Sequence, residues 1–224
     1  MLPMLLACAG TGVILLSGEY FSRKRILKGE FARKYVHILT ATFVAFWPLF
    51  LSHYQIAILS LLFAAMVVTV QKFKVLRSFK AVRRTTYGEI WYALGIGLVA
   101  LLFQDDAIFS IAILQMALAD GFAAVVGVGL GKKAIRYRYK NINKSIAGSM
   151  TFLLISFILN LFYWFALNSD ALGASTISPA LPVLLSASSA IILTFVEIVA
   201  PKGSDNVIVP GLAATLLWLP VAVG

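Results

Sequence analysis

The chain has 224 residues, of which 61% are hydrophobic and only 12% charged, and its mean hydropathy is +0.93. A soluble domain carries nearer a quarter of charged residues, because a folded core must still cover its surface with polar groups. The composition therefore excludes an ordinary soluble protein and indicates one domain, residues 1–224, whose solvent is lipid. The single cysteine, Cys8, excludes a disulfide framework and a cysteine-based zinc site.

A helix needs about 20 apolar residues to cross the hydrocarbon core of a bilayer. Eight segments meet this requirement, and they predict an all-α polytopic bundle: 2–18, 35–52, 54–71, 88–104, 107–131, 147–168, 180–200 and 207–223. The second and third segments are joined only by Ser52 and His53, so we expect an antiparallel hairpin there. Residues 72–84 mix basic and apolar positions and predict an amphipathic helix at the membrane interface. No segment is predicted as a strand.

The basic residues fall on one side of this topology. All 19 Lys and Arg residues follow an odd-numbered predicted helix, in 23–34, 72–84, 132–144 and at Lys202. The opposite loops carry acidic residues instead: Asp105, Asp106 and Asp170. By the positive-inside rule, the N-terminus lies outside and the basic loops lie in the cytoplasm. The charge of +10 is explained by topology and by anionic lipid headgroups, so nucleic acid is not expected as a partner.

Two groups of ionisable residues at the edges of spans are functional candidates, because charges there are costly. Arg33, Lys34 and His37 can share one face at the start of the second span, which suits a phosphate-rich ligand. The alternative interpretation is a basic anchor beside a structural histidine. Glu89 begins the fourth span, where a carboxylate is also favoured by the helix dipole alone.

The fifth span contains the strongest signal, a carboxylate within an apolar run. Asp120 is followed by a stripe of small residues, Ala123, Gly127 and Gly131, which allows a backbone or a ligand to approach closely. A lone buried carboxylate needs a partner, either a divalent metal or a basic side chain from another helix. The segment fits neither the P-loop nor the dinucleotide-binding pattern.

Two further groups lie where later spans begin or end. Lys144, Ser145, Gly148 and Ser149 enter the sixth span, and a helix N-terminus flanked by Ser and Lys binds anions or is simply capped. Glu197 ends the seventh span. Asp205 and Asn206 follow it between Gly and Pro residues, which indicates irregular backbone with oxygen ligands suited to Mg²⁺.

In order, these motifs resemble the membrane lipid-alcohol kinase family, which includes phytol kinase, dolichol kinase and the CTP-dependent diacylglycerol kinase and is related to phosphatidate cytidylyltransferases. The resemblance covers residues 33 to 212. It rests on the following set: Arg33-Lys34-x-x-His37, Gly88-Glu89, Asp120-x-x-Ala123-x-x-x-Gly127-x-x-x-Gly131-Lys132, Lys144-Ser145-x-x-Gly148-Ser149 and Asp205-Asn206-x-x-x-Pro210.

The resemblance implies transfer of a phosphoryl group from CTP, with Mg²⁺, to the hydroxyl of an isoprenoid or other lipid alcohol at the cytoplasmic face. It implies that Asp120, His37 and Lys144 are catalytic, and that Asp120 and Asp205 hold the metal. His37 either accepts the substrate proton or positions a phosphate. The implied nucleotide- and phosphate-binding residues are Arg33, Lys34, Gly127, Gly131, Lys132, Ser145, Gly148, Ser149 and Asn206. The expected partners are the lipid alcohol, the nucleotide and the bilayer, and a homo-oligomer is left open.

The chain departs from the family pattern at two positions, where Ala147 and Ser204 replace acidic residues. Three alternatives stand beside the kinase, and these departures motivate the third. One is a cytidylyltransferase that forms a CDP-lipid, and another is a small transporter with an ion site at Asp120 and Glu197. The third is a membrane subunit that has lost its activity.

Overall fold

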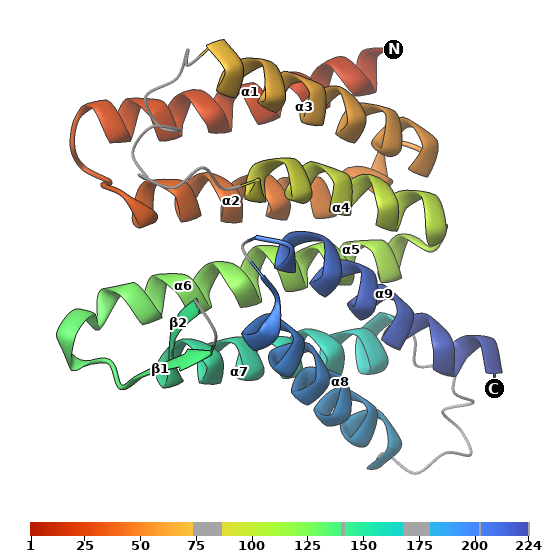
Figure 1. The fold of residues 1–224 in the computed structure, drawn as a ribbon. Coiled ribbons are helices and arrows are strands. Elements are labelled where there is room, and N and C mark those ends of the chain that lie inside the picture. Colours follow the sequence, from red (N-terminus) through yellow and green to blue (C-terminus); the bar gives the residue numbers. More distant parts are fainter. Residues whose placement is uncertain (74–86, 140–141, 168–179, 202, 224) are drawn as a thin grey trace.

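The structure is a computed structural model that describes residues 1–73, 87–139, 142–167, 180–201 and 203–223. These residues form a bundle of long helices with one short β-hairpin (Figure 1). Eight long helical segments occur in the predicted order, which confirms the all-α transmembrane fold. Their bounds are α1 Leu2–Arg23, α2 Glu30–Ala45, α3 His53–Phe73, α4 Gly88–Leu102, α5 Asp106–Leu114 continuing into α6 Asp120–Gly129, α7 Ile146–Phe162, α8 Ala180–Val199 and α9 Asp205–Val223.

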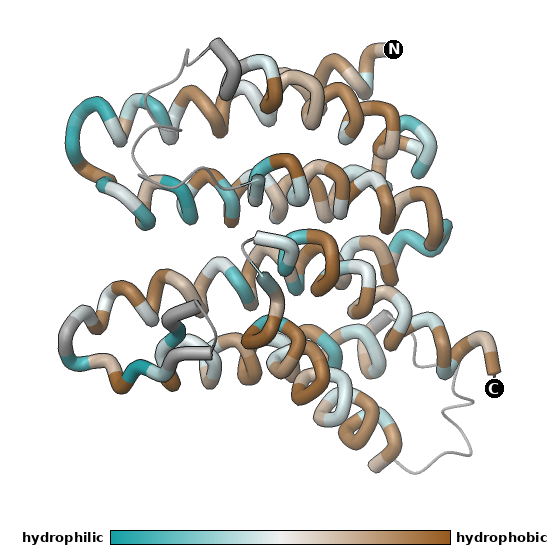
Figure 2. The backbone as a smooth tube through the Cα atoms, viewed as in Figure 1, coloured by the Kyte–Doolittle hydropathy of each residue, from teal (hydrophilic) through white to brown (hydrophobic). Residues whose placement is uncertain are grey.

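The helices are apolar on their outer as well as their inner faces. Five are long and apolar enough to cross a bilayer, and α3 and α4 contribute shorter apolar stretches, His53–Thr69 and Gly88–Leu102. Large apolar side chains such as Leu16, Leu154 and Phe195 are exposed. Figure 2 shows hydrophobic residues along most of the length of the helices. A helix that is apolar all round belongs in a membrane, so the protein is membrane-associated.

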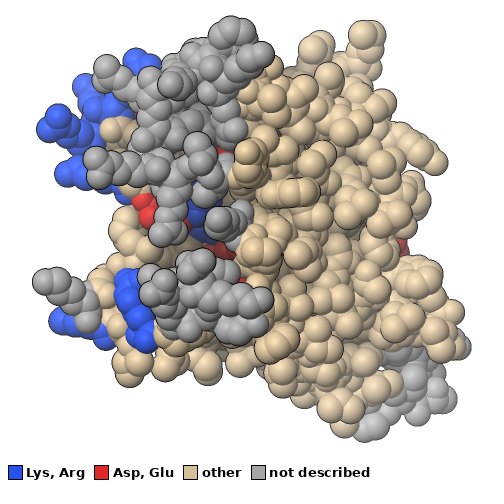
Figure 3. All heavy atoms as spheres, viewed as in Figure 1, with Lys and Arg blue, Asp and Glu red and all other residues tan. Residues whose placement is uncertain are grey.

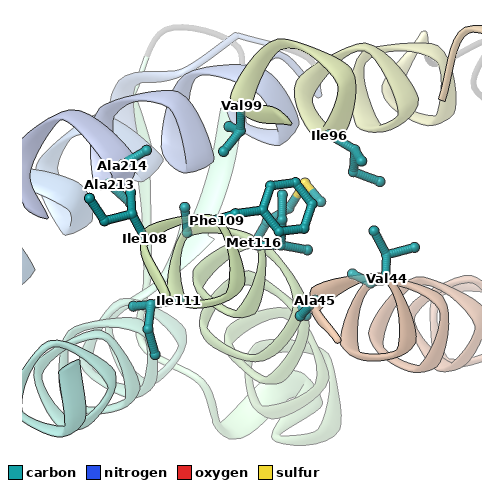
Figure 4. Close-up of a cluster of buried hydrophobic side chains, with 14 of the residues drawn as sticks. Val44, Ala45, Ile96, Val99, Ile108, Phe109, Ile111, Met116, Ala213 and Ala214 are labelled. Carbon is teal, nitrogen blue, oxygen red and sulfur yellow. The ribbon is translucent and has the colours of Figure 1, made fainter. Parts of the chain in front are cut away.

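The segment from α5 to α6 runs through the centre of the bundle. Phe109 of α5 and Met116 are fully buried, and Figure 4 shows side chains of α2, α4 and α9 around them, among them Val44, Ile96 and Ala213. Between α5 and α6 the backbone forms a π-helical turn, η3 (Gln115–Ala119), and a second π-helical turn, η5 (Tyr163–Leu167), follows α7. Short 3-10 turns, η1 (Trp47–Leu49) and η4 (Gly131–Lys133), follow α2 and α6.

Two sequence predictions are corrected by the fold. The expectation of no strand is wrong, because β1 (Arg136–Tyr139) pairs antiparallel with β2 (Ile142–Ser145), with Tyr137 opposite Lys144. The tight hairpin expected at Ser52 and His53 is also wrong, because residues 46–52, which include η1, connect α2 to α3, and α3 packs mainly against α4. The amphipathic helix predicted for 72–84 lies almost wholly outside the described residues.

Charge separates the two ends of the bundle. Figure 3 shows the Lys and Arg side chains gathered at the left end, with acidic side chains between the upper and lower groups. At the opposite end, Asp105 caps α5 by accepting a hydrogen bond from the Ile108 N–H, and Asp106 lies 2.9 Å from the buried His53 Nε2. The ends of the bundle thus differ in charge as the sequence predicts.

Candidate active site

A buried ion pair joins α2 to α6. Lys34 Nζ lies 2.5 Å from Asp120 Oδ2 and donates a second hydrogen bond to the Asp120 carbonyl oxygen. His37 Nε2 lies 3.4 Å from the same carboxylate oxygen, and all three side chains are at least nine-tenths buried. Of the two partners expected for Asp120, a divalent metal or a basic side chain from another helix, the structure provides the basic one, Lys34.

The π-helical turn η3 supplies a hydrogen-bond acceptor for His37. Its last bond runs from the Asp120 N–H to the Gln115 carbonyl, five residues back, and the Met116 carbonyl accepts a hydrogen bond from His37 Nε2 at 3.0 Å. Because a carbonyl only accepts, Nε2 carries the proton, and a neutral imidazole has its lone pair on Nδ1. Such π-helical turns are frequent at functional sites.

A second buried pair joins the hairpin to α8. Lys144, in β2, donates hydrogen bonds to both the side-chain carboxylate and the backbone carbonyl of Glu197. Glu197 Oε2 is buried and has no hydrogen-bond partner among the described residues. The hairpin and the helix end thus fix Lys144, while one oxygen of Glu197 is left to bind a ligand.

The start of α9 is tied to the start of α4. Asn206 Nδ2 donates to the Gly88 carbonyl at 2.9 Å, and a Cβ at Gly95 would collide with the Asn206 carbonyl. Gly203 has φ +89, and a Cβ there would lie 2.8 Å from Gly88 Cα, so only glycine fits this turn. The start of α9 packs against α4, and in Figure 1 it lies near the middle of the bundle.

These pieces form one electrostatically connected cluster. The charge of Asp205 interacts with those of Asp120, Lys34, Lys144 and His37. Glu197 interacts with Asp120 and Asp205 in addition to Lys144, and Arg33 interacts with Asp120 and Glu89 as well as with its hydrogen-bond partner Glu30. The structure therefore brings Arg33, His37, Asp120, Lys144 and Asp205 into one region. Asp120 lies about 14 Å from the end of α6, so the cluster is inside the span.

Comparison with known proteins decides the family. The chain is 30% identical over 217 residues to a phytol kinase of Synechocystis sp., covering 95% of this chain and 89% of that protein. The chain belongs to the phytol kinase family. It is also 30% identical to a probable chloroplastic phytol kinase 1 of Glycine max, over 92% of this chain and 74% of that protein. No family model matches the chain. No solved structure matches it.

Membership of the phytol kinase family confirms the lipid-alcohol kinase predicted from the ordered motifs. The two buried ion pairs use residues of those motifs, namely Lys34, Asp120 and Lys144. A kinase of this class needs fixed cations near phosphate and a place for a metal, since phosphoryl transfer is mainly positioning and charge neutralisation. The family therefore favours the kinase over the transporter.

The small residues of the motifs pack helices together. A Cβ at Gly127 would lie 2.7 Å from Ser145 Oγ, and one at Gly148 would lie 2.8 Å from the Ala123 carbonyl, so α6 and α7 meet along this stripe. Gly131 has φ +51 in the turn after α6. The stripe thus brings the start of α7 against α6, close to Asp120.

The start of α7 is partly capped by the protein. Ser145 Oγ accepts from the Gly148 N–H at 3.1 Å, and the Ile146 N–H donates to the Ile135 carbonyl. Ser149 Oγ lies 2.6 Å from the hydroxyl of Tyr137, and burial raises the pKa of that phenol. Two of the first N–H groups are therefore already satisfied. The side chain of Lys132, another predicted phosphate ligand, lies outside the described residues.

The side chains of the cluster suit Mg²⁺ only if a bound ligand supplies part of its coordination shell. No group of three or more His, Cys, Asp or Glu in the described ranges is arranged to hold a metal by itself. Mg²⁺ usually takes one or two carboxylates and completes its shell with water and substrate phosphates. Two carboxylates at the α8–α9 junction fit this role, Asp205, which has no ion pair in the described chain, and Glu197 through its unpartnered Oε2.

The sequence analysis gives Glu197 a role only in the transporter alternative, and its pairing with Lys144 brings it into the cluster. The signal in the sequence is a carboxylate two residues before the end of an apolar helix. Tyr92, which packs on His37 with ring centroids 4.9 Å apart, was missed because an aromatic residue in an apolar span gives no signal of its own. Ser204, one of the two departures from the family pattern, has a buried hydroxyl without a partner among the described residues.

Proposed function

We propose that the chain transfers the γ-phosphoryl group of CTP to the hydroxyl of a long-chain isoprenoid alcohol of the phytol type, with Mg²⁺, at the cytoplasmic side of the membrane. The alcohol oxygen attacks the γ-phosphorus, the bond from that phosphorus to the β–γ bridging oxygen breaks, and CDP leaves. One proton is released from the alcohol. The products are CDP and the phosphorylated alcohol.

The observation that carries this proposal is the connected cluster of buried cations and carboxylates inside an apolar bundle. Buried charges are expensive and persist where they are paired or serve a ligand. Lys34 is matched by Asp120 and Lys144 by Glu197, while Asp205 has no salt bridge among the described residues. The cluster thus has an excess carboxylate for a cation and two fixed ammonium groups for phosphate.

The roles of the cluster's residues follow from their contacts. Lys34 and Lys144 neutralise phosphate charge, and Arg33 adds a third positive charge at the start of α2. Asp205 and Glu197 would hold Mg²⁺, which would neutralise the phosphate oxygens. From the sequence we expected Asp120 as a metal ligand beside Asp205, but we assign it here to its two basic neighbours. Asp120 holds Lys34 and His37 in place, since its Oδ2 is engaged by Lys34. Asn206 fixes α9 against α4 through Gly88 and thereby positions Asp205.

The assay that tests this function offers the purified protein four nucleotides (CTP, UTP, ATP and GTP) with Mg²⁺ and four alcohols (phytol, farnesol, polyprenol and diacylglycerol). We expect CDP and a phosphorylated isoprenoid in equal amounts from CTP. A parallel reaction offers phosphatidic acid in place of the alcohol, and release of pyrophosphate with formation of a CDP-lipid there would instead establish the cytidylyltransferase. No transfer from any pairing would contradict the proposal.

The cytoplasmic orientation rests on the basic residues at one end of the bundle. We expect a cysteine at Lys24, introduced by Lys24→Cys in a Cys8→Ser background, to be shielded from an impermeant maleimide added to intact cells. A cysteine introduced by Gln104→Cys at the opposite end should react. Both side chains are exposed in the bundle, so reactivity reports the side of the membrane. The reverse pattern of labelling would contradict the orientation.

A further inference from the structure

The hydroxyl of Tyr92 is buried beside the cluster and has no hydrogen-bond partner in the described part of the chain. Its ring packs against His37 at 4.9 Å between centroids and 56° between planes. Tyr92 lies one turn after Gly88 on α4, the residue that accepts the hydrogen bond from Asn206. A buried hydroxyl normally finds a partner, so an unpaired one next to an active-site histidine calls for a ligand.

Thr40, one turn after His37 on α2, shows the same property. Its Oγ1 is buried and unpartnered among the described residues. Threonines elsewhere in the helices donate to the carbonyl four residues back, as the following pairs do: Thr11 to Ala7, Thr151 to Ala147, Thr194 to Ala190 and Thr215 to Gly211. Thr40 instead leaves its hydroxyl available. Thr42 Oγ1 is also unpartnered, but two residues along a helix place it on a different face.

Both hydroxyls therefore belong to residues next to His37, which reaches Asp120 Oδ2 at 3.4 Å. One turn further along each helix the residue is apolar, Val44 after Thr40 and Ile96 after Tyr92, and both are buried in the core (Figure 4). The surroundings pass from charged groups through neutral hydroxyls to aliphatic side chains within two helical turns. An amphiphilic alcohol has the same order of groups from its reacting end to its tail.

We infer that Tyr92 and Thr40 form the subsite for the hydroxyl of the acceptor lipid alcohol, an inference that rests on the proposed kinase function. An alcohol O–H donates one hydrogen bond and accepts others, as do a phenol and a threonine hydroxyl, so the three groups complement each other. Phosphate, in contrast, is bound preferentially by Lys and Arg side chains. The subsite places the alcohol oxygen beside His37 and keeps it apart from the ammonium groups that bind the nucleotide.

The test uses Tyr92→Phe and Thr40→Val, which remove the hydroxyls and keep the shapes. We expect each to lower kcat/KM for the alcohol about tenfold, the loss of one hydrogen bond. The KM for the nucleotide should stay unchanged, and so should the melting temperature, because the hydroxyls have no partner among the described residues. Thr42→Val is the matched control and should behave as the wild type.

Unchanged kcat/KM for the alcohol in both variants would overturn the subsite. So would a rise in the KM for the nucleotide as large as the fall in kcat/KM for the alcohol. Binding of labelled phytol without nucleotide is measured as well. A wild type that binds phytol but transfers no phosphoryl group refutes the kinase function alone. Equal phytol binding by wild type, Tyr92→Phe and Thr40→Val refutes the subsite alone.

Discussion

The variant Asp120→Asn is expected to lose phosphoryl transfer by at least about 100-fold while the protein still inserts into the membrane. Removal of one preorganised electrostatic contact costs about that much in kcat. The uncharged amide would no longer neutralise Lys34, whose Nζ lies 2.5 Å from the native carboxylate, nor hold His37 in place. Steady-state assay of the purified variant with CTP, Mg²⁺ and phytol measures the loss.

A double variant separates catalysis from stability. Breaking a buried pair on one side costs about 3–5 kcal/mol because a charge is left unmatched. Lys34→Gln combined with Asp120→Asn removes both charges, so its thermal stability should recover relative to the single variant while its activity stays low. Recovery of activity in the double variant would show that Asp120 only balances charge. Asp106→Asn, an exposed position at the opposite end, serves as the control with wild-type activity.

The second large effect is expected at the other buried pair. Lys144→Ala should abolish detectable activity, and Glu197→Gln should require a higher Mg²⁺ concentration for half-maximal rate, by at least about tenfold. Lys144 is fixed by two hydrogen bonds to Glu197, and Glu197 Oε2 has no partner among the described residues. Mg²⁺ is held by few carboxylates, so the loss of one charged ligand weakens it strongly.

The Mg²⁺ titration distinguishes a metal ligand from a structural partner of Lys144. If Glu197 only anchors Lys144, Glu197→Gln lowers kcat but keeps the wild-type Mg²⁺ dependence, which would contradict its role as a ligand. Lys133→Ala removes an exposed basic side chain from the same basic segment and should change neither quantity. Comparison with Lys133→Ala thus removes any effect of total charge.

The helices could be predicted from the sequence because a bilayer demands long apolar runs. The ends of α8 differ from the predicted span by a single residue, and α5 and α6 together follow the predicted fifth span. The π-helical turn at Gln115–Ala119 could not be foreseen, since its apolar residues continue the pattern of the flanking helices. The hairpin was missed because each of its strands has only four residues and lies within a basic loop, which is too short a run for a strand pattern to stand out.

The charged residues that the structure brings together could be named from the sequence, but their pairings could not. Asp120 stands out in the sequence because a carboxylate within an apolar span is energetically costly. Only the packing of α2 on α6 shows that Lys34 is its partner. The glycines were ambiguous, because a small-residue stripe serves a ligand or a neighbouring helix equally well. In the structure, Gly127 of α6 lies against the start of α7, and Gly148 of α7 lies against α6. Whether phosphate also approaches there depends on contacts that sequence spacing does not encode.

The central claim is that the cluster around Asp120, Lys144 and Asp205 binds the metal and the nucleotide. Its most direct test is an experimental structure with a non-hydrolysable CTP analogue and Mn²⁺ in place of Mg²⁺, with the metal located by its anomalous scattering. We predict a metal peak beside Asp205 and Glu197, with phosphates beside Lys34 and Lys144. A nucleotide bound at the opposite end of the bundle, near His53 and Asp106, or a metal peak far from Asp205, would contradict the account.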